Sequence, residues 1–133
     1  MGGRGCPVRR GTSRATPRRL ERAPGNVVGV ATADFTVIPL GAEGGVSAYL
    51  AEIHRRLAAQ DRVAFEMRGM GTQLDGEAED IFALVAEMHR VPFELGLPRV
   101  YTILKLDERR DAPGRTNADK VRAVRDRLEG APD

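Results

Sequence analysis

The sequence predicts an α+β fold in which an antiparallel sheet carries its main helices on one face. Segments with apolar residues at every second position alternate with segments whose apolar residues recur every three or four positions. Along the chain these segments follow the order strand, helix, strand, strand, helix, strand, helix. A length of 133 residues and a hydrophobic content of 41% are enough for one ordinary domain with its own core.

The first regular segment is a strand over residues 30–38, which Pro39 and Gly41 are expected to end. One face of this strand is apolar and consists of Ala31, Ala33, Phe35 and Val37. A helix is expected to follow to about Ala59, with Ser47 as its N-cap. The apolar stripe of this helix consists of Val46, Tyr49, Leu50, Ile53 and Leu57.

Two further strands are separated by a glycine-rich turn. Val63, Phe65 and Met67 alternate with polar residues, which indicates a half-buried strand, and residues 72–74 form a short third strand. Between them, Gly69 and Gly71 allow a tight turn, a bulge or the close approach of a ligand to the backbone.

A second helix is expected to start after Gly76, with acidic residues in its first turn, where the helix dipole favours them. Its apolar stripe consists of Ile81, Leu84, Val85, Met88 and Leu95. Pro92 lies inside this pattern and predicts a kink, or an early end near Arg90. The last strand covers residues 99–106, and a final helix begins at about Asn117.

Right-handed connections place both main helices on one face of the sheet, which is the arrangement of a ferredoxin-like plait (β-α-β-β-α-β) with an extra C-terminal helix. The opposite face, called here the open face, is then uncovered in a monomer. Its predicted residues are Thr32, Asp34, Thr36, Glu66, Arg68, Met70, Arg99, Tyr101, Ile103 and Lys105. Their mixture of apolar and charged side chains favours a hydrated oligomer interface or a polar ligand pocket.

Charge is distributed unevenly along the chain. Residues 1–29 contain seven arginines and one glutamate, a balance of +6; the whole chain is +2, which leaves −4 for residues 30–133. Residues 1–29 have little apolar content and are predicted to be a disordered basic tail ahead of a folded domain at residues 30–130. A basic arm for nucleic acid or lipid, a transit peptide, and a start codon assigned too far upstream are the three interpretations. Nineteen arginines against two lysines suggest a GC-rich gene and favour the last, with translation beginning near Val27, Val28 or Val30.

The residue types argue against several function classes. The single cysteine, Cys6, excludes a disulfide or a thiolate metal cluster within one chain. His54 and His89 have no further His or Cys at metal-ligand spacing, so neither a metal nor a cofactor is expected. RNA-recognition modules of this fold need several exposed aromatic residues, and the open face offers only Tyr101, so no nucleic-acid partner is expected.

No apolar run approaches the ~18 residues of a membrane-spanning helix, and no signal-peptide pattern is present. We therefore expect no membrane association and a cytoplasmic location.

Asp34 and Glu66 are expected to project from neighbouring strands of the open face, where basic residues can balance them. One interpretation is an ion-pair network within the sheet or across a subunit interface. The other is a polar pocket for a small cation or an aminopyrimidine, since a carboxylate pairs well with an aminopyrimidine edge. The residues alone leave both interpretations open.

Three stretches of the chain resemble the small, single-domain members of the YkoF-like thiamine-binding proteins. They are residues 36–41 (TVIPLG), 65–72 (FEMRGMGT) and 98–111 (PRVYTILKLDERRD), and the likeness extends from Val30 to Leu128. The resemblance implies a ferredoxin-like plait assembled as dimers or tetramers that binds thiamine or its hydroxymethylpyrimidine part without catalysis. Carried over by position, it implies a ligand site that comprises Asp34, Thr36, Glu66, Met70, Gly71 and Thr72, with Asp34 at a position where relatives often have Glu.

The favoured hypothesis is therefore a non-enzymatic, homo-oligomeric binder of thiamine or a related pyrimidine. The alternative from another class is a regulatory or assembly module that acts through protein–protein contacts. A cofactor-independent enzyme comes third, because the sequence shows no poised acid–base pair.

Overall fold

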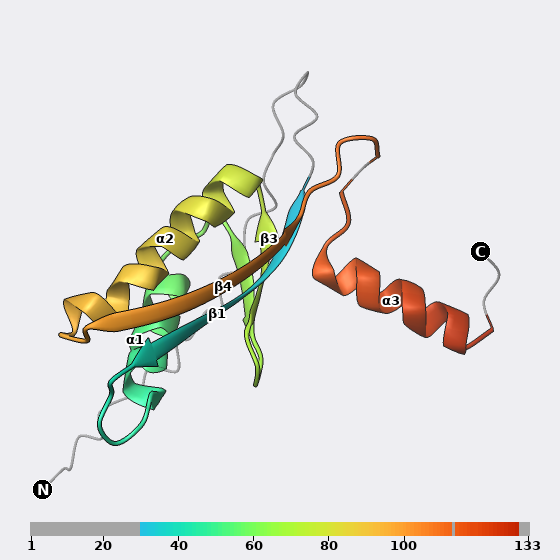
Figure 1. Cartoon of the computed structure of the whole chain (residues 1–133). Helices are drawn as coiled ribbons and strands as arrows, with labels where there is room; N and C mark the ends of the chain where they lie inside the picture. Colours follow the sequence, from blue (N-terminus) through green and yellow to red (C-terminus); the bar gives the residue numbers. More distant parts are fainter. Residues whose placement is uncertain (1–29, 113, 131–133) are drawn as a thin grey trace, which may run out of the picture.

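The computed structural model describes residues 30–112 and 114–130 (Figure 1). Its elements are β1 (Ala31–Leu40), α1 (Ser47–Ala58), β2 (Ala64–Met67), β3 (Thr72–Gly76), α2 (Ala78–Glu94), β4 (Arg99–Asp107) and α3 (Asn117–Leu128). The strands form one sheet in the order β2-β3-β1-β4, and all neighbouring pairs are antiparallel. The predicted ferredoxin-like plait with an extra C-terminal helix is confirmed. The predicted basic tail lies outside the described residues.

The core lies between the sheet and the two helices that cover one of its faces, α1 and α2 (Figure 1). The alternation of β1 is confirmed, because Ala31, Ala33, Phe35 and Val37 are all buried against these helices. The fully buried side chains of the core are Leu57 of α1, Leu74 of β3, and Ile81, Leu84, Met88, Val91 and Pro92 of α2. Burial of such side chains, at roughly 1.5–3 kcal/mol each, is the main favourable term for this fold.

Two predicted element ends are wrong. β1 does not stop at Pro39 but continues to Leu40, which pairs with Arg99 of β4. Here β1 has no described strand on its other side, and proline is tolerated at such a sheet edge. Ser47 is not the N-cap of α1, since Val46 occupies that position without any side-chain cap and accepts the first hydrogen bonds through its carbonyl.

The predicted early end of this helix near Arg90 is also wrong, because α2 continues through Pro92 to Glu94. A proline this close to the end removes one helical hydrogen bond, and the burial of its ring offsets part of that cost. The Leu97 N–H donates to the Pro92 carbonyl at 3.0 Å, and Gly96 with φ +94° ends the helix. The predicted stripe of α2 holds except at Leu95, which is the C-cap and is 49% exposed.

The open face carries the predicted side chains, since Arg99, Tyr101, Ile103 and Lys105 of β4 are exposed while the residues between them are partly buried. α3 meets this face only at its first turn and extends away from the sheet (Figure 1). The side-chain amide of Asn117 donates to the Leu74 carbonyl at 3.0 Å and to Asp75 Oδ1 at 3.1 Å. None of the helices in the described part of the chain is both long and apolar enough to cross a membrane.

Candidate ligand-binding pocket

The strand β1 is longer than its neighbour β3, and this difference leaves a notch in the sheet. Their pairing ends where Phe35 faces Thr72, while β1 continues along β4 as far as Leu40. A pocket of about 230 Å³, called here the notch pocket, occupies this place between β1, α1 and the β2–β3 turn. It is lined by Phe35, Thr36 and Val37 of β1, Leu50 and Ile53 of α1, and residues 67–72.

The β2–β3 turn is fixed to β1 by hydrogen bonds. Thr36 Oγ1 donates to the Met70 carbonyl at 3.0 Å, and the Arg68 N–H donates to the Gly71 carbonyl at 2.8 Å. The first bond joins the turn to β1, and the second closes the turn on itself. These two bonds hold the backbone wall of the pocket against β1.

Gly71 is required by the close approach of this turn to β1. A Cβ at this position would lie 2.8 Å from Asp34 Oδ1, 3.0 Å from Thr36 Oγ1 and 3.2 Å from the Phe35 carbonyl oxygen. Gly69, two residues earlier in the same turn, has nothing within 4 Å of a Cβ. The expectation from sequence that a glycine allows close approach here therefore applies to Gly71 and not to Gly69.

The two predicted carboxylates are not on neighbouring strands, which corrects the sequence-based expectation. β3 lies between β1 and β2, so that Gln73 separates Asp34 from Glu66 on the open face. With strands about 4.8 Å apart, the two backbones are roughly 10 Å from each other. Glu66 forms a 2.9 Å ion pair with Arg68, and Asp34 lies opposite Lys105 in the β1–β4 register. Neither carboxylate lines the notch pocket.

The residues of the notch pocket suit a small, mostly apolar ring with a few hydrogen-bonding groups. Its walls include aromatic, aliphatic and thioether side chains, and its polar groups are the hydroxyls of Thr36 and Thr72 and the guanidinium of Arg68. Met70 is 91% exposed, which leaves its thioether free to contact a ligand. Arg68 is the only ionisable side chain among the lining residues, which gives the pocket no acid–base pair.

The sequence profile of a family described as "Thiamine-binding protein" matches residues 33–125 of this chain. The chain belongs to the thiamine-binding protein family. The matched span contains the notch pocket and most of α3, and the resemblance to this family found in the sequence is confirmed.

Relatives and solved structures agree with this membership. The UPF0045 protein YqgV of Bacillus subtilis is 36% identical over 104 residues, which cover 75% of this chain and 99% of the relative. A UPF0045 protein of Staphylococcus xylosus is 39% identical over 99 residues, which cover 71% of this chain and 92% of the relative. A solved protein of Methanocaldococcus jannaschii has a TM-score of 0.64 and 29% identity, and covers 71% of this chain and 95% of its own.

A Thermotoga maritima protein proposed to act in thiamine biosynthesis or salvage shares the fold. Its TM-score is 0.61 at 21% identity, with 71% of this chain and 98% of that chain covered. This likeness shows a common fold.

Of the six residues that the resemblance implied, four line the notch pocket of this family member: Thr36, Met70, Gly71 and Thr72. Sequence reasoning missed the wall formed by Phe35, Val37, Leu50 and Ile53, because their periodicity also identifies them as core residues. The signal that could have found this wall is the unequal length of the first and third apolar strands.

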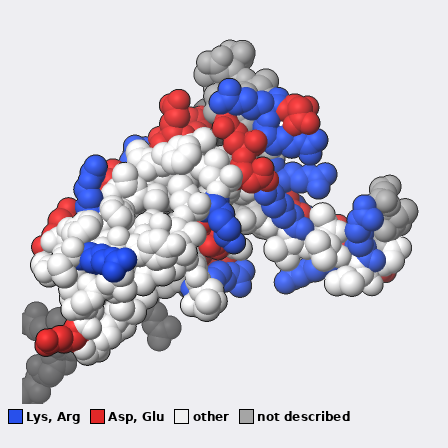
Figure 2. All heavy atoms as spheres, viewed as in Figure 1, with Lys and Arg blue, Asp and Glu red and all other residues white. Residues whose placement is uncertain are grey.

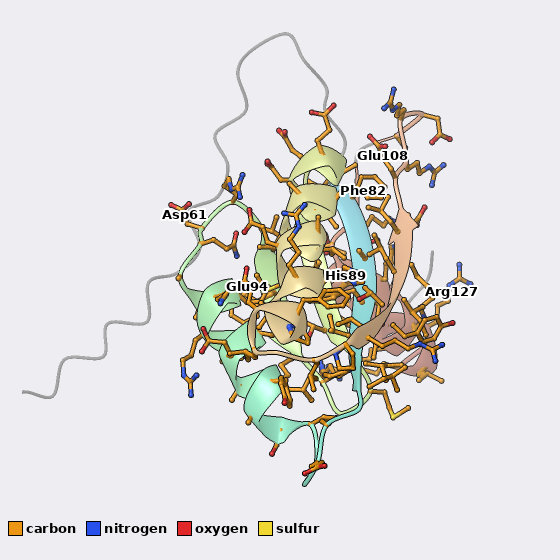
Figure 3. All side chains as sticks on the ribbon, turned by 60° about the vertical axis from the view of Figure 1, so that its left-hand side comes forward. Asp61, Phe82, His89, Glu94, Glu108 and Arg127 are labelled. Atoms are coloured by element: carbon orange, nitrogen blue, oxygen red, sulfur yellow. The ribbon has the colours of Figure 1, made fainter. Side chains whose placement is uncertain are left out.

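The histidines lie elsewhere. His54 on α1 is exposed and contacts Phe65 edge to face. His89 lies on the side of α2 that faces β4 (Figure 3). It is partly buried, and its Nδ1 is 2.7 Å from Thr102 Oγ1. Within residues 30–112 and 114–130, no group of three His, Cys, Asp or Glu side chains is arranged to hold a metal ion.

One carboxyl group of the open face has a shifted pKa. Burial raises the pKa of Asp75, while the Asn117 backbone N–H, at 2.8 Å from Oδ1, and the Asn117 side-chain amide oppose this shift. This group belongs to the attachment of α3 and does not line the notch pocket.

Proposed function

We propose that the protein binds thiamine, or a related hydroxymethylpyrimidine, in the notch pocket and that it does so without catalysing a reaction. One observation carries this proposal: four of the six residues implied by the family resemblance line a single pocket. Membership of a family described as thiamine-binding also supports it.

The chemistry of the notch pocket supports the pyrimidine half of the vitamin as its occupant. An aminopyrimidine has flat apolar faces and an edge of hydrogen-bond donors and acceptors. The apolar walls suit the faces, and the Met67 and Met70 sulfurs suit the ring edge. Thr36, Thr72 and the backbone of the turn offer partners for the polar edge.

The volume of the notch pocket supports only partial enclosure of the ligand by one chain. Small-molecule sites generally occupy about 300–1,000 Å³, and this pocket has about 230 Å³. We propose that the thiazolium end leaves the pocket toward the open face. Asp34 and Glu66 then act on the cationic ring as nearby charges, through electrostatic attraction.

We also propose a cytoplasmic homo-oligomer, a dimer or tetramer, formed through the open face. Tyr101 and Ile103, central on β4, are 55% and 42% exposed, although large apolar side chains are usually covered. A second chain on this face would also cover the side of the notch pocket on which Thr36 lies.

Isothermal titration of the full chain with thiamine and with 4-amino-5-hydroxymethyl-2-methylpyrimidine tests the ligand. We expect saturation at micromolar concentrations with about one site per chain or per dimer. The free pyrimidine should retain most of the affinity, because the pocket holds that half of the vitamin.

A pair of glycine variants tests the site. Gly71→Ala should lower the affinity at least about tenfold, because a Cβ there pushes the turn away from Asp34 and Thr36. Gly69→Ala is the matched control, since a Cβ at that position meets nothing within 4 Å. Unchanged affinity in Gly71→Ala, with the variant folded by circular dichroism, would place the ligand elsewhere. A flat titration with both compounds would remove the proposal.

The second candidate is an assembly module that acts on other proteins, and the same exposed residues on β4 favour it. Ile103→Glu separates the two hypotheses. If sedimentation shows a monomer that still binds thiamine, the open face serves self-association and the pocket serves the ligand. If the wild type is already a monomer and binds no pyrimidine, the assembly module becomes the better explanation.

A further inference from the structure

A second pocket lies at the other end of β1 from the notch pocket. It has a volume of about 250 Å³ and is called here the basic pocket. The start of β1, the end of β4, the β4–α3 loop and α3 all contribute to it, through Val30, Thr32, Asp107, Arg109, Arg115 and Lys120. Three of these side chains are cationic, and only one is acidic.

Lys120 is held in position by two hydrogen bonds. Its Nζ donates to Thr32 Oγ1 at 2.6 Å and to Asp107 Oδ2 at 2.8 Å. Thr32 is only 4% exposed, so the ammonium group is anchored to a buried hydroxyl. An ammonium has three N–H groups, and one of them has no partner among the described residues. The β4–α3 loop passes close to the start of β1, because a Cβ on Gly114 would overlap the backbone of Val30.

The two arginines of the pocket keep donors available. Arg109 uses Nε and Nη2 to bind Asp111 at 2.6 and 3.0 Å, which leaves its Nη1 without a partner in the described part of the chain. Arg115 makes no hydrogen bond or ion pair within residues 30–112 and 114–130. An exposed guanidinium with five N–H groups facing a pocket is suited to bind an oxyanion through two parallel hydrogen bonds.

The distribution of charge along the chain also favours a negatively charged ligand. Residues 30–98 contain five basic residues (Lys and Arg) and eleven acidic residues (Asp and Glu). Residues 99–130 contain nine basic and six acidic residues. Figure 2 shows the basic side chains gathered over the end of β4, the following loop and α3. The basic pocket therefore lies in the positive part of a molecule whose other part is acidic.

We propose that the basic pocket binds a phosphate or diphosphate group. Arg115 and the remaining donors of Arg109 come from the β4–α3 loop, and the remaining donor of Lys120 comes from α3. Donors on two elements suit an anion with several oxygens. Asp107 opposes binding, and its pairing with Lys120 weakens that opposition. This site is separate from the notch pocket, and the proposal stands whether or not the protein binds thiamine.

The phosphate group can come from two sources, a free anion or the ester of a ligand whose other end lies in the notch pocket. Thr32 of the basic pocket and Thr36 of the notch pocket lie on the same face of β1, four residues apart. At about 3.3 Å per residue, this separation is roughly 13 Å. An extended phosphorylated pyrimidine compound is of comparable length.

Titration of the full chain with inorganic diphosphate tests the site, with the folded state of each variant checked by circular dichroism. We expect one saturable site per chain for the wild type. Arg115→Gln should weaken binding about tenfold, because a charge-assisted pair of hydrogen bonds is lost. Arg110→Gln is the matched control: Arg110 is in the same loop, its side chain is 83% exposed and it does not line the pocket. Asp107→Asn should strengthen binding several-fold, because the only acidic side chain of the pocket is removed.

Three results would overturn the proposal. The first is a flat titration of the wild type with inorganic diphosphate. The second is an equal loss of affinity in Arg115→Gln and in Arg110→Gln. The third is an unchanged affinity in both single variants, Asp107→Asn and Arg115→Gln. The second would indicate unspecific attraction to a basic surface, and the third would place the anion outside this pocket.

Thiamine and thiamine diphosphate distinguish the two sources. If a phosphate ester bridges the pockets, thiamine diphosphate should bind at least about tenfold more tightly than either thiamine or inorganic diphosphate. Arg115→Gln should then remove that advantage and leave thiamine binding unchanged. Equal affinities for the two diphosphates would indicate a free-anion site. Saturation by inorganic diphosphate with no response to thiamine would contradict the proposed function and still support this inference.

Discussion

The two faces of the sheet differ sharply, although the same strands supply both. On the face covered by α1 and α2, Leu74 of β3 is completely buried, and the side chains packed around it belong to one continuous apolar core. Toward the open face, the contacts with α3 are hydrogen bonds made by Asn117 and Lys120. Beyond these, α3 leaves Val124 and Leu128 59% and 81% exposed.

Stability and ligand binding are therefore associated with different faces of the sheet. The covered face is dry and supplies most of the free energy of folding through burial. The open face is held by a few directional contacts, each of which contributes little once the competition with water is included. The basic pocket lies at one end of the open face, and the notch pocket, with Thr36, borders it at the other.

Leu74→Ala should have the largest effect, because it opens a cavity in the centre of the covered face. We expect the free energy of unfolding to fall by about 2–5 kcal/mol, measured by urea denaturation. The control is Gln73, the adjacent residue, which lies on the open face. Gln73→Ala should change the free energy of unfolding by less than about 0.5 kcal/mol. If the two variants were equally destabilised, the two faces would not differ as described.

Asn117→Ala should have an intermediate effect that is confined to α3. The variant loses the side-chain hydrogen bonds to the Leu74 carbonyl and to Asp75, and leaves Asp75 with only the backbone N–H. We expect a loss of about 1–3 kcal/mol in stability, with faster amide hydrogen exchange in α3 and unchanged exchange in α1 and α2. Arg125→Ala, on the exposed part of α3, should leave both quantities near the wild-type values. Faster exchange in all three helices would contradict the local attachment of α3.

Asp75 should produce the smallest effect, visible as a dependence on pH. Burial raises the pKa of Asp75 in the folded protein above its ordinary value of 3.8, so between these two values the folded state binds more protons than the unfolded state. The contribution of Asp75 to stability therefore falls as pH rises through this interval, and the loss is complete above the folded pKa.

Asp75→Asn removes this titration and keeps an oxygen that accepts from Asn117. The stability of the wild type relative to this variant should decrease as pH is raised from about 3 to 7, as measured by denaturation at each pH. An increase instead would mean that the Asn117 hydrogen bonds outweigh burial.

Much of the fold was predictable from local patterns. The alternation in β1 and β4 predicted which side chains face the helices, and the three- and four-residue spacing in α2 predicted its buried stripe. In each of these cases a short-range property of the chain is enough to set the outcome. Gly69 and Gly71 were both predicted to allow a close approach, and the structure shows one only at Gly71, against Asp34, Thr36 and the Phe35 carbonyl.

Predictions failed where the deciding neighbour is distant in sequence. Pro39 was expected to end β1, and Pro92 to kink α2 or end it near Arg90. Pairing with β4 extends β1 to Leu40, and α2 continues to Glu94 with the Pro92 ring buried. Asp34 and Glu66 were placed on adjacent strands because both face the same side, but β3 lies between them. The order of strands in a sheet depends on long-range pairing, which the period of each strand does not reveal.

The elements, their order, the plait and the family could all be read from the amino-acid sequence, because they follow from periodicity, turn residues and motifs along the chain. The notch pocket could not, since it exists because β1 extends beyond β3 in the sheet. The basic pocket could not either, since Lys120 reaches Thr32 across 88 positions to line it. Both pockets depend on register and on contacts between distant segments, and these are settled only when the whole chain packs.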